Sequence, residues 1–243
     1  MPLTYATWDP TRVGTGCVLS NGNLTATGNP GANDMTAATI GKSSGKHFWE
    51  ITVVSATTAV GAAISDSSAV MTGNVGSDTH SLGYATFIGS SYIVYNGSYT
   101  SFGASYTAGD VLGCALDMDN GTFKLYKNGT LLGTGKTGLT GTWFPTTGSL
   151  GNNAYSFTAN FGASAFAYTV PSGYRAGVYT GSLGGLMRLP DLTGVSGMFN
   201  PSLMRVIHET LTQTRRYITD LANLYRRQYL DNWCRFNWPC LQH

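Results

Sequence analysis

The sequence predicts an all-β body, a two-sheet β-sandwich, followed by a Gly-rich linker and a C-terminal α-helix. Three observations lead to this prediction. Short apolar segments alternate with Asn-Gly and other Gly-rich turns as far as about residue 176, which is typical of antiparallel strands. No helical periodicity appears before residue 185. After residue 200, apolar residues recur at alternating spacings of three and four, which indicates an amphipathic helix.

The strand predicted at the centre of the sandwich is residues 45–53, GKHFWEITV. Because side chains alternate between the two faces of a strand, Trp49 and Ile51 share one face, while Phe48 and Glu50 share the other. Tryptophan and β-branched residues favour a pleated, half-buried surface. We therefore expect Trp49 in the core. We expect Glu50 to be a hydrogen-bonded structural group rather than a catalytic acid.

Turn signals place further strands around this segment. Asn-Gly is the strongest short hairpin signal, because both central residues of a type I′ turn need a positive φ. It occurs at Asn21-Gly22, Asn96-Gly97, Asn120-Gly121 and Asn128-Gly129. The polar, Gly- and Ser-rich residues 65–81 predict a long loop, and such loops are often functional. Residues 98–108 predict a second exposed loop.

The composition favours a displayed protein. Only 11% of the residues are charged, against roughly 25% in an ordinary soluble domain, so the surface must consist of Gly, Ser, Thr and Asn, as in virion proteins, adhesins and lectin-like modules. Residues 1–185 contain seven Lys/Arg and eight Asp/Glu, whereas residues 186–243 contain seven Arg and four acids, which indicates two parts with different roles. No signal peptide or membrane span is recognisable, so synthesis in a reducing cytoplasm is expected, with Cys17 and Cys114 as buried thiols.

Several positions together resemble the SPRY family. In family order between about residues 5 and 175, they are the strand 45–53, residues 61–64, 109–113, Leu116-Asp117, Phe123, Tyr126, Asn128-Gly129, Phe144-Pro145, residues 160–162 and Phe166. The opening, with residues 8–10 and 19–24, is similar to SPRY-like proteins of tailed bacteriophages. The resemblance implies a bent, concanavalin-like two-sheet sandwich that acts as a binding module, with its ligand contacts on variable loops.

Two short motifs suggest other chemistry but lack its context. Residues 133–138 match the letters of a phosphate-binding glycine motif, yet no helix follows them, so a turn is expected there. Asp117, Asp119 and Asn120 loosely match a calcium loop, but position twelve is Asn128 in place of Glu, which favours a hairpin turn. No His or Cys stands at metal-ligand spacing. We therefore predict no metal, no cofactor and no catalytic residue.

Exposed aromatic side chains are the candidate ligand contacts. Tyrosine beside Asn- and Ser-rich loops is typical of binding surfaces, because the ring is apolar and its hydroxyl is polar. We expect Tyr99, Tyr106, Asn152 and Asn153 to be exposed and to contact a ligand.

The C-terminal segment is the candidate assembly interface. Asn200-Pro201 is a good helix start, and the apolar seam that follows is sustained over about three heptads. One alternative is that this helix packs on the sandwich. Another is that its arginine pairs contact nucleic acid, but the lack of Lys in this segment makes nucleic-acid binding less favoured. The residues expected in the interface are Met204, Ile207, Leu211, Ile218, Leu221, Tyr225, Trp233, Phe236 and Trp238.

These features predict a non-enzymatic structural component of a bacteriophage particle, either a tail-fibre or host-recognition protein or a decoration protein. Residues 1–176 bind a protein or glycan on the host surface, and residues 177–199 are the linker. Residues 200–243 fasten the chain to its own copies or to other virion proteins. Two alternatives stay open. One is a carbohydrate-active enzyme or lectin-like sugar-binding module, which as a glycosidase needs two carboxylates at a defined separation. The other is a SPRY adaptor that binds host proteins.

Overall fold

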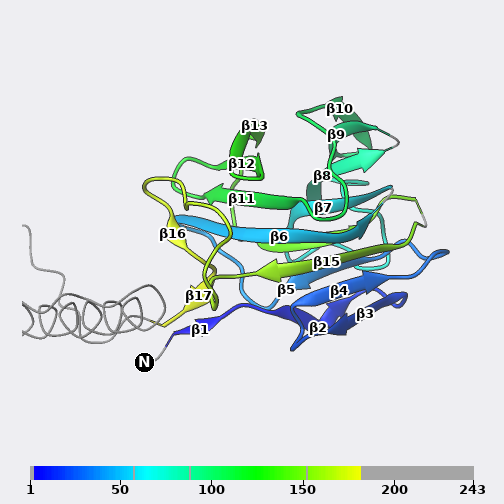
Figure 1. The fold of residues 1–243 in the computed structure, drawn as a ribbon, viewed down its shortest axis with the longest axis horizontal. Helices are drawn as coiled ribbons and strands as arrows, with labels where there is room; N and C mark the ends of the chain where they lie inside the picture. Colours follow the sequence, from blue (N-terminus) through cyan, green and yellow to red (C-terminus); the bar gives the residue numbers. More distant parts are fainter. Residues whose placement is uncertain (1–2, 57, 88, 152, 182–243) are drawn as a thin grey trace, which may run out of the picture. The chain divides into compact units, whose positions relative to one another are not determined.

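The computed structural model describes residues 3–56, 58–87, 89–151 and 153–181. These residues belong to one compact unit, Met1–Gly185, and they form strands, turns and loops with no α-helix among them. Two largely antiparallel sheets make up this unit (Figure 1). The predicted two-sheet sandwich is confirmed. The predicted C-terminal helix, all of its interface residues and most of the predicted linker lie outside the described residues.

The first sheet has seven strands in the order β10-β9-β8-β7-β14-β5-β2. In chain order, its strands are β2 (Trp8–Val13), β5 (Met35–Ala38), β7 (Thr58–Ser65), β8 (Ser81–Phe87), β9 (Ser90–Tyr95), β10 (Ser98–Ser101) and β14 (Phe144–Ser149).

The second sheet has the order β13-β12-β11-β6-β15-β4-β3, with β16 also paired to β6. In chain order, its strands are β3 (Cys17–Ser20), β4 (Thr25–Gly28), β6 (Lys46–Ala56), β11 (Val111–Asp117), β12 (Thr122–Lys127), β13 (Thr130–Lys136), β15 (Tyr155–Asn160) and β16 (Arg175–Ala176). A separate two-stranded pair joins β1 (Thr4–Tyr5) to β17 (Tyr179–Thr180).

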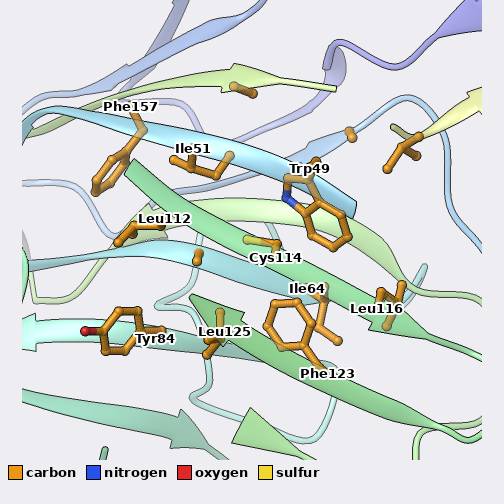
Figure 2. Close-up of a cluster of buried hydrophobic side chains, with 14 of the residues drawn as sticks. Trp49, Ile51, Ile64, Tyr84, Leu112, Cys114, Leu116, Phe123, Leu125 and Phe157 are labelled. Carbon is orange, nitrogen blue, oxygen red and sulfur yellow. The ribbon is translucent and has the colours of Figure 1, made fainter. Parts of the chain in front are cut away.

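Strand β6 supplies the centre of the core, as its sequence predicts. Trp49 is completely buried, and its ring stacks on Phe123 of β12 with 5.9 Å between ring centroids. Figure 2 shows these two rings beside Cys114 of β11 and Ile64 of β7. Because β7 belongs to the seven-stranded sheet, the cluster joins the two layers. Cys17 and Cys114 are both buried free thiols, as expected.

The other face of β6 is buried as well. Phe48 packs edge-to-face against Phe166, with 5.3 Å between ring centroids. The Glu50 carboxylate accepts hydrogen bonds from the backbone N–H groups of Ala167, at 2.8 Å, and Tyr168, at 3.0 Å. The segment after β15 therefore covers the outer face of the sheet at this point. The prediction that Glu50 is a hydrogen-bonded structural group is confirmed.

At Asn120-Gly121 only the glycine has a positive φ, of 61°, whereas the other three Asn-Gly pairs adopt the backbone conformation that the signal predicts. Both residues of each of these three pairs have a positive φ: 52° and 62° at Asn21-Gly22, 51° and 70° at Asn96-Gly97, and 48° and 78° at Asn128-Gly129. They connect β3 to β4, β9 to β10, and β12 to β13.

The third of these turns is hydrogen-bonded to Asp110, which also belongs to the sequence resemblance. The Asn128 side chain donates from Nδ2 to Asp110 at 2.7 Å and accepts at Oδ1 from the backbone N–H of Val111 at 2.8 Å. Lys127 forms a 3.0 Å ion pair with the same aspartate. Burial alone would raise the pKa of Asp110, but these bonds and the amide of Thr107 hold that pKa below its ordinary value. The cluster therefore ties the residues just before β11 to the β12–β13 turn.

Two of the remaining sequence expectations differ in detail from the structure, and one is confirmed. The hairpin turn after Asp117 is confirmed, since its carboxylate accepts N–H groups from Asp119 and Asn120. The turn expected at residues 133–138 is wrong in part, because β13 continues to Lys136 as an edge strand with register shifts. The sheet structure also extends past residue 176 into the predicted linker, since β17 pairs with β1 and Val178 is fully buried.

We predict that Trp49→Ala lowers the free energy of unfolding by about 3–5 kcal/mol, because it removes a large buried ring and leaves a cavity between the sheets. Chemical denaturation of the full chain measures this change. Val54→Ala on the same strand is the control, because Val54 is 51% exposed and should change stability by less than about 0.5 kcal/mol. Equal effects of the two substitutions would contradict the placement of Trp49.

We predict that Glu50→Gln lowers the free energy of unfolding by about 1–3 kcal/mol, because an amide NH₂ group would then face one of the two backbone N–H groups that the carboxylate now satisfies. Thr52→Ala, an exposed position two residues along the same face, serves as the matched control. The comparison again uses denaturation midpoints. A Glu50→Gln protein as stable as the parent would show that the carboxylate has no structural role.

Candidate binding site

The hairpins β8–β9 and β9–β10 expose aromatic side chains on the outer face of the seven-stranded sheet. In the strand register, Ala85 of β8 pairs with Tyr92 of β9, and Val94 of β9 pairs with Tyr99 of β10. The residues between them in sequence, such as Ile93, point into the main core. Because side chains alternate along a strand, Tyr92 and Tyr99 share the outer face. These strands lie at the top of Figure 1.

The long loop predicted between β7 and β8 covers part of this outer face. Val75 from that loop is fully buried and packs in a second apolar cluster that is separate from the main core. The other members of this cluster are Met35, Val60, Ala63, Ala85, Val94 and Leu150. Tyr92 is only half buried and lies at the margin of the cluster. The covered part of the face therefore ends next to the exposed tyrosines.

An open hollow of about 450 Å³ lies at this margin, and we call it the aromatic hollow. Phe87 and Tyr99 are 47% and 56% exposed, which is unusual for large apolar side chains. The rings of Tyr92 and Tyr99 meet edge-to-face, with 6.0 Å between centroids and an interplanar angle of 81°. The described residues that line the hollow are Asn74, Phe87, Tyr92, Tyr99, Leu150, Gly151 and Asn153.

The polar side of the aromatic hollow is built by hydrogen bonds between two loops. The backbone N–H of Gly151 donates to Oδ1 of Asn74 at 3.0 Å, which ties the residues after β14 to the long loop. Nδ2 of Asn153 donates to the carbonyl oxygens of Leu150, at 2.9 Å, and Gly151, at 2.6 Å. Both amide side chains are thus held in fixed orientations without any ligand.

The structure brings together two of the four residues expected to contact a ligand. Tyr99 is exposed, as predicted, whereas Asn153 is only partly exposed and lines the same hollow. Asn152 lies outside the described residues. Phe87 and Asn74 are lining residues that sequence reasoning misses. Phe87 lies two residues after Ala85 on β8, so strand alternation could have placed it on the outer face. No local pattern identifies Asn74, because its position depends on the path of the long loop.

The expectation that Tyr106 is exposed is wrong. Its side chain is 1% exposed and packs edge-to-face on Tyr84 inside the core. Its hydroxyl donates to the carbonyl oxygen of Ala59 at 2.7 Å and accepts from the backbone N–H of Gly61 at 2.8 Å. Gly61 lies at a register shift in β7, where the ladder between strands is interrupted. The tyrosine satisfies backbone groups at this irregularity, and burial raises the pKa of its phenol well above the ordinary value.

A second, smaller hollow of about 340 Å³ lies where the edges of the two sheets meet. Its lining includes Ile93, Tyr95 and Phe102 from the seven-stranded side and Lys136 from β13. The Lys136 ammonium group lies 4.2 Å from the ring centroid of Tyr95, a cation–π contact that covers one face of that ring. This contact makes the second hollow the weaker candidate for ligand binding.

Three acidic groups of the domain, Glu50, Asp110 and Asp117, have structural partners. Glu50 and Asp110 hold backbone amides, as described above, and Asp117 forms a 3.0 Å ion pair with Lys46. Burial alone would raise the pKa of Asp117, but its bonds to Asn120 and Lys46 hold that pKa below the ordinary value. Among the described residues, no group of three or more His, Cys, Asp or Glu is placed to hold a metal ion. No helix in the same part of the chain is long and apolar enough to cross a membrane.

Comparisons with solved structures agree with this architecture. The SPRY domain of human HERC1 matches with a TM-score of 0.53 and 22% sequence identity, over 63% of this chain and 96% of that one. The TRIM65 PSpry domain matches with a TM-score of 0.53 and 20% identity, over 65% and 92%. Stonustoxin matches with a TM-score of 0.50 and 21% identity, over 65% of this chain but only 27% of its own. At these identities, the likeness shows the fold alone.

The family model for the SPRY domain matches residues 46–163. This range begins at β6 and ends just after β15, so it contains β6, β11 and β12, the strands that carry the Trp49 core. SPRY domains commonly act as protein–protein interaction modules and are typically non-enzymatic. Residues 46–163 of this chain thus match the SPRY domain family.

Proposed function

We propose that this chain is a non-enzymatic binding component of a bacteriophage particle, a tail-fibre, host-recognition or decoration protein. In this proposal, the aromatic hollow contacts a glycan or protein on the host surface. The C-terminal segment, residues 200–243, joins the module to its own copies or to other virion proteins. The observation behind the binding role is the hollow itself, where two strongly exposed aromatic side chains, Phe87 and Tyr99, lie beside two fixed amides.

The physical argument for binding is the cost of leaving these side chains in water. Large apolar groups are normally buried, and exposed apolar surface that gathers in one place marks an interaction site. Aromatic residues are also enriched among the residues that dominate binding energies. The binding role agrees with the common use of SPRY domains as interaction modules.

The alternative of a carbohydrate-active enzyme predicts two carboxylates facing one cleft. Glu50, Asp110 and Asp117 instead hold backbone amides or lysine side chains. None of the described residues that line the aromatic hollow is acidic. These observations favour binding over catalysis.

The placement on a phage particle is supported by the sequence. The opening of the chain, residues 8–10 and 19–24, is similar to phage-encoded SPRY-like proteins. The low charge content suits a displayed surface, and residues 200–243 combine a heptad-like seam with an aromatic tail. A tail of this kind is an aggregation hazard unless an interface covers it. We therefore propose the virion as the location of the chain. The second candidate function is that of a SPRY adaptor that binds host proteins.

We predict that Phe87→Asp weakens binding of the labelled full chain to cells of the bacterial host by at least about tenfold, because a carboxylate would be desolvated among aromatic rings. Flow cytometry with increasing protein concentration measures the affinity. Leu131→Asp is the control, because Leu131 is 52% exposed on β13, away from the aromatic hollow. If both variants bind as the parent does, the aromatic hollow is not the contact surface.

We predict that the full chain forms oligomers and that a chain ending at residue 197 is a folded monomer. The reason is that the deleted residues contain the proposed assembly seam. Light scattering coupled to size-exclusion chromatography gives both masses, and thermal unfolding shows whether the shorter chain keeps its fold. A monomeric full chain, or a shortened chain that still enters phage particles, would contradict the assembly role.

A further inference from the structure

The lining of the aromatic hollow restricts the chemistry of its ligand. None of its described residues carries a carboxylate, an ammonium or a guanidinium group. A charged group on a ligand would lose water in the hollow without gaining an opposite charge, which is unfavourable. The matching ligand is therefore neutral. It must also have an apolar face for the rings and polar groups for the amides.

The rings offer two differently oriented apolar surfaces. Tyr92 and Tyr99 stand nearly perpendicular to each other, with an interplanar angle of 81°. Phe87, at the end of β8, adds a third ring to the same hollow and is 47% exposed. Rings in this arrangement can contact a flat ligand on one side and its edge on another, while each tyrosine hydroxyl remains available for hydrogen bonding. The C–H face of a pyranose ring fits such a surface.

The two amides that line the hollow have opposite ends left unused by their hydrogen bonds. The backbone N–H of Gly151 donates to Oδ1 of Asn74, so this hydrogen bond leaves the Nδ2 donor of Asn74 unused. The carbonyl oxygens of Leu150 and Gly151 accept hydrogen bonds from Nδ2 of Asn153. These bonds leave the Oδ1 acceptor of Asn153 unused. One rim therefore offers a hydrogen-bond donor and the other an acceptor, which is the pair that adjacent hydroxyl groups require.

We propose that the ligand of the aromatic hollow is a neutral carbohydrate, one or a few sugar rings that stack on Tyr99 and Phe87 and bond to Asn74 and Asn153. This inference rests on the proposed binding role of the hollow and specifies the ligand. The volume of about 450 Å³ lies in the range of small-ligand sites. The amides are already held by the protein, so little ordering is needed when the sugar binds.

The test uses the purified full chain on two arrays. One array carries neutral mono- to tetrasaccharides beside uronic-acid and sialylated sugars, and the other carries uncharged peptides that contain aromatic residues. We expect binding to neutral sugars, with weaker or no binding to the acidic ones. Tyr99→Ala and Phe87→Ala should each weaken sugar binding by about tenfold, because each removes a stacking ring. Val18→Ala, at an equally exposed position on β3 of the other sheet, should leave sugar binding unchanged.

Three other outcomes overturn the inference, and they separate it from the proposed function. Binding to peptides that Tyr99→Ala abolishes, without binding to sugars, overturns the carbohydrate ligand and leaves the binding role of the hollow intact. Sugar binding that neither Tyr99→Ala nor Phe87→Ala weakens places the sugar site elsewhere on the chain. Binding to neither array, by a chain that thermal unfolding shows to be folded, counts against both the carbohydrate ligand and the binding role.

Discussion

Trp49 and Glu50 are neighbours on β6 that point in opposite directions and stabilise two different layers of the domain. The indole stacks on Phe123 and fills the space between the sheets, while the carboxylate binds the backbone of Ala167 and Tyr168 on the outer side. A strand that is buried on both faces has a strongly specified register, because a shift by one residue would place a carboxylate in the core. The remaining strands of both sheets are positioned relative to this register.

The aromatic hollow depends on that core through two buried tyrosines. Tyr84 and Tyr106 pack edge-to-face, with 5.0 Å between ring centroids, on the inner side of the sheet whose outer side forms the hollow. The hydroxyl of Tyr84 donates to the carbonyl of Ala104, and Tyr106 bonds to Ala59 and Gly61. These bonds fix the strands β7 and β8 together with the loop that follows β10. The outer aromatic residues are thereby presented on a rigid support, as a preformed binding site requires.

Local patterns predict the central features of this fold, since they depend on alternation and turn chemistry alone. Trp49 in the core, Glu50 as a bonded group and the turn at Asn128-Gly129 follow from a few neighbouring residues each. The binding site is less predictable, because its parts meet only through long-range contacts. Tyr99 stands out as an aromatic residue in a polar stretch, but Tyr106 has the same local setting and is buried. Only the bulge at Gly61, far away in sequence, decides between them.

The central claim is that ligand contact occurs on the outer face of β8 to β10 while β6 serves only the fold. Hydrogen–deuterium exchange of the full chain, with and without its ligand, addresses this claim most directly. We expect backbone amides around the β9–β10 turn and near Gly151 to exchange more slowly when the ligand is bound, with no change at β12 and β13. Slower exchange confined to the β12–β13 hairpin, with none near Tyr99, would contradict the claim.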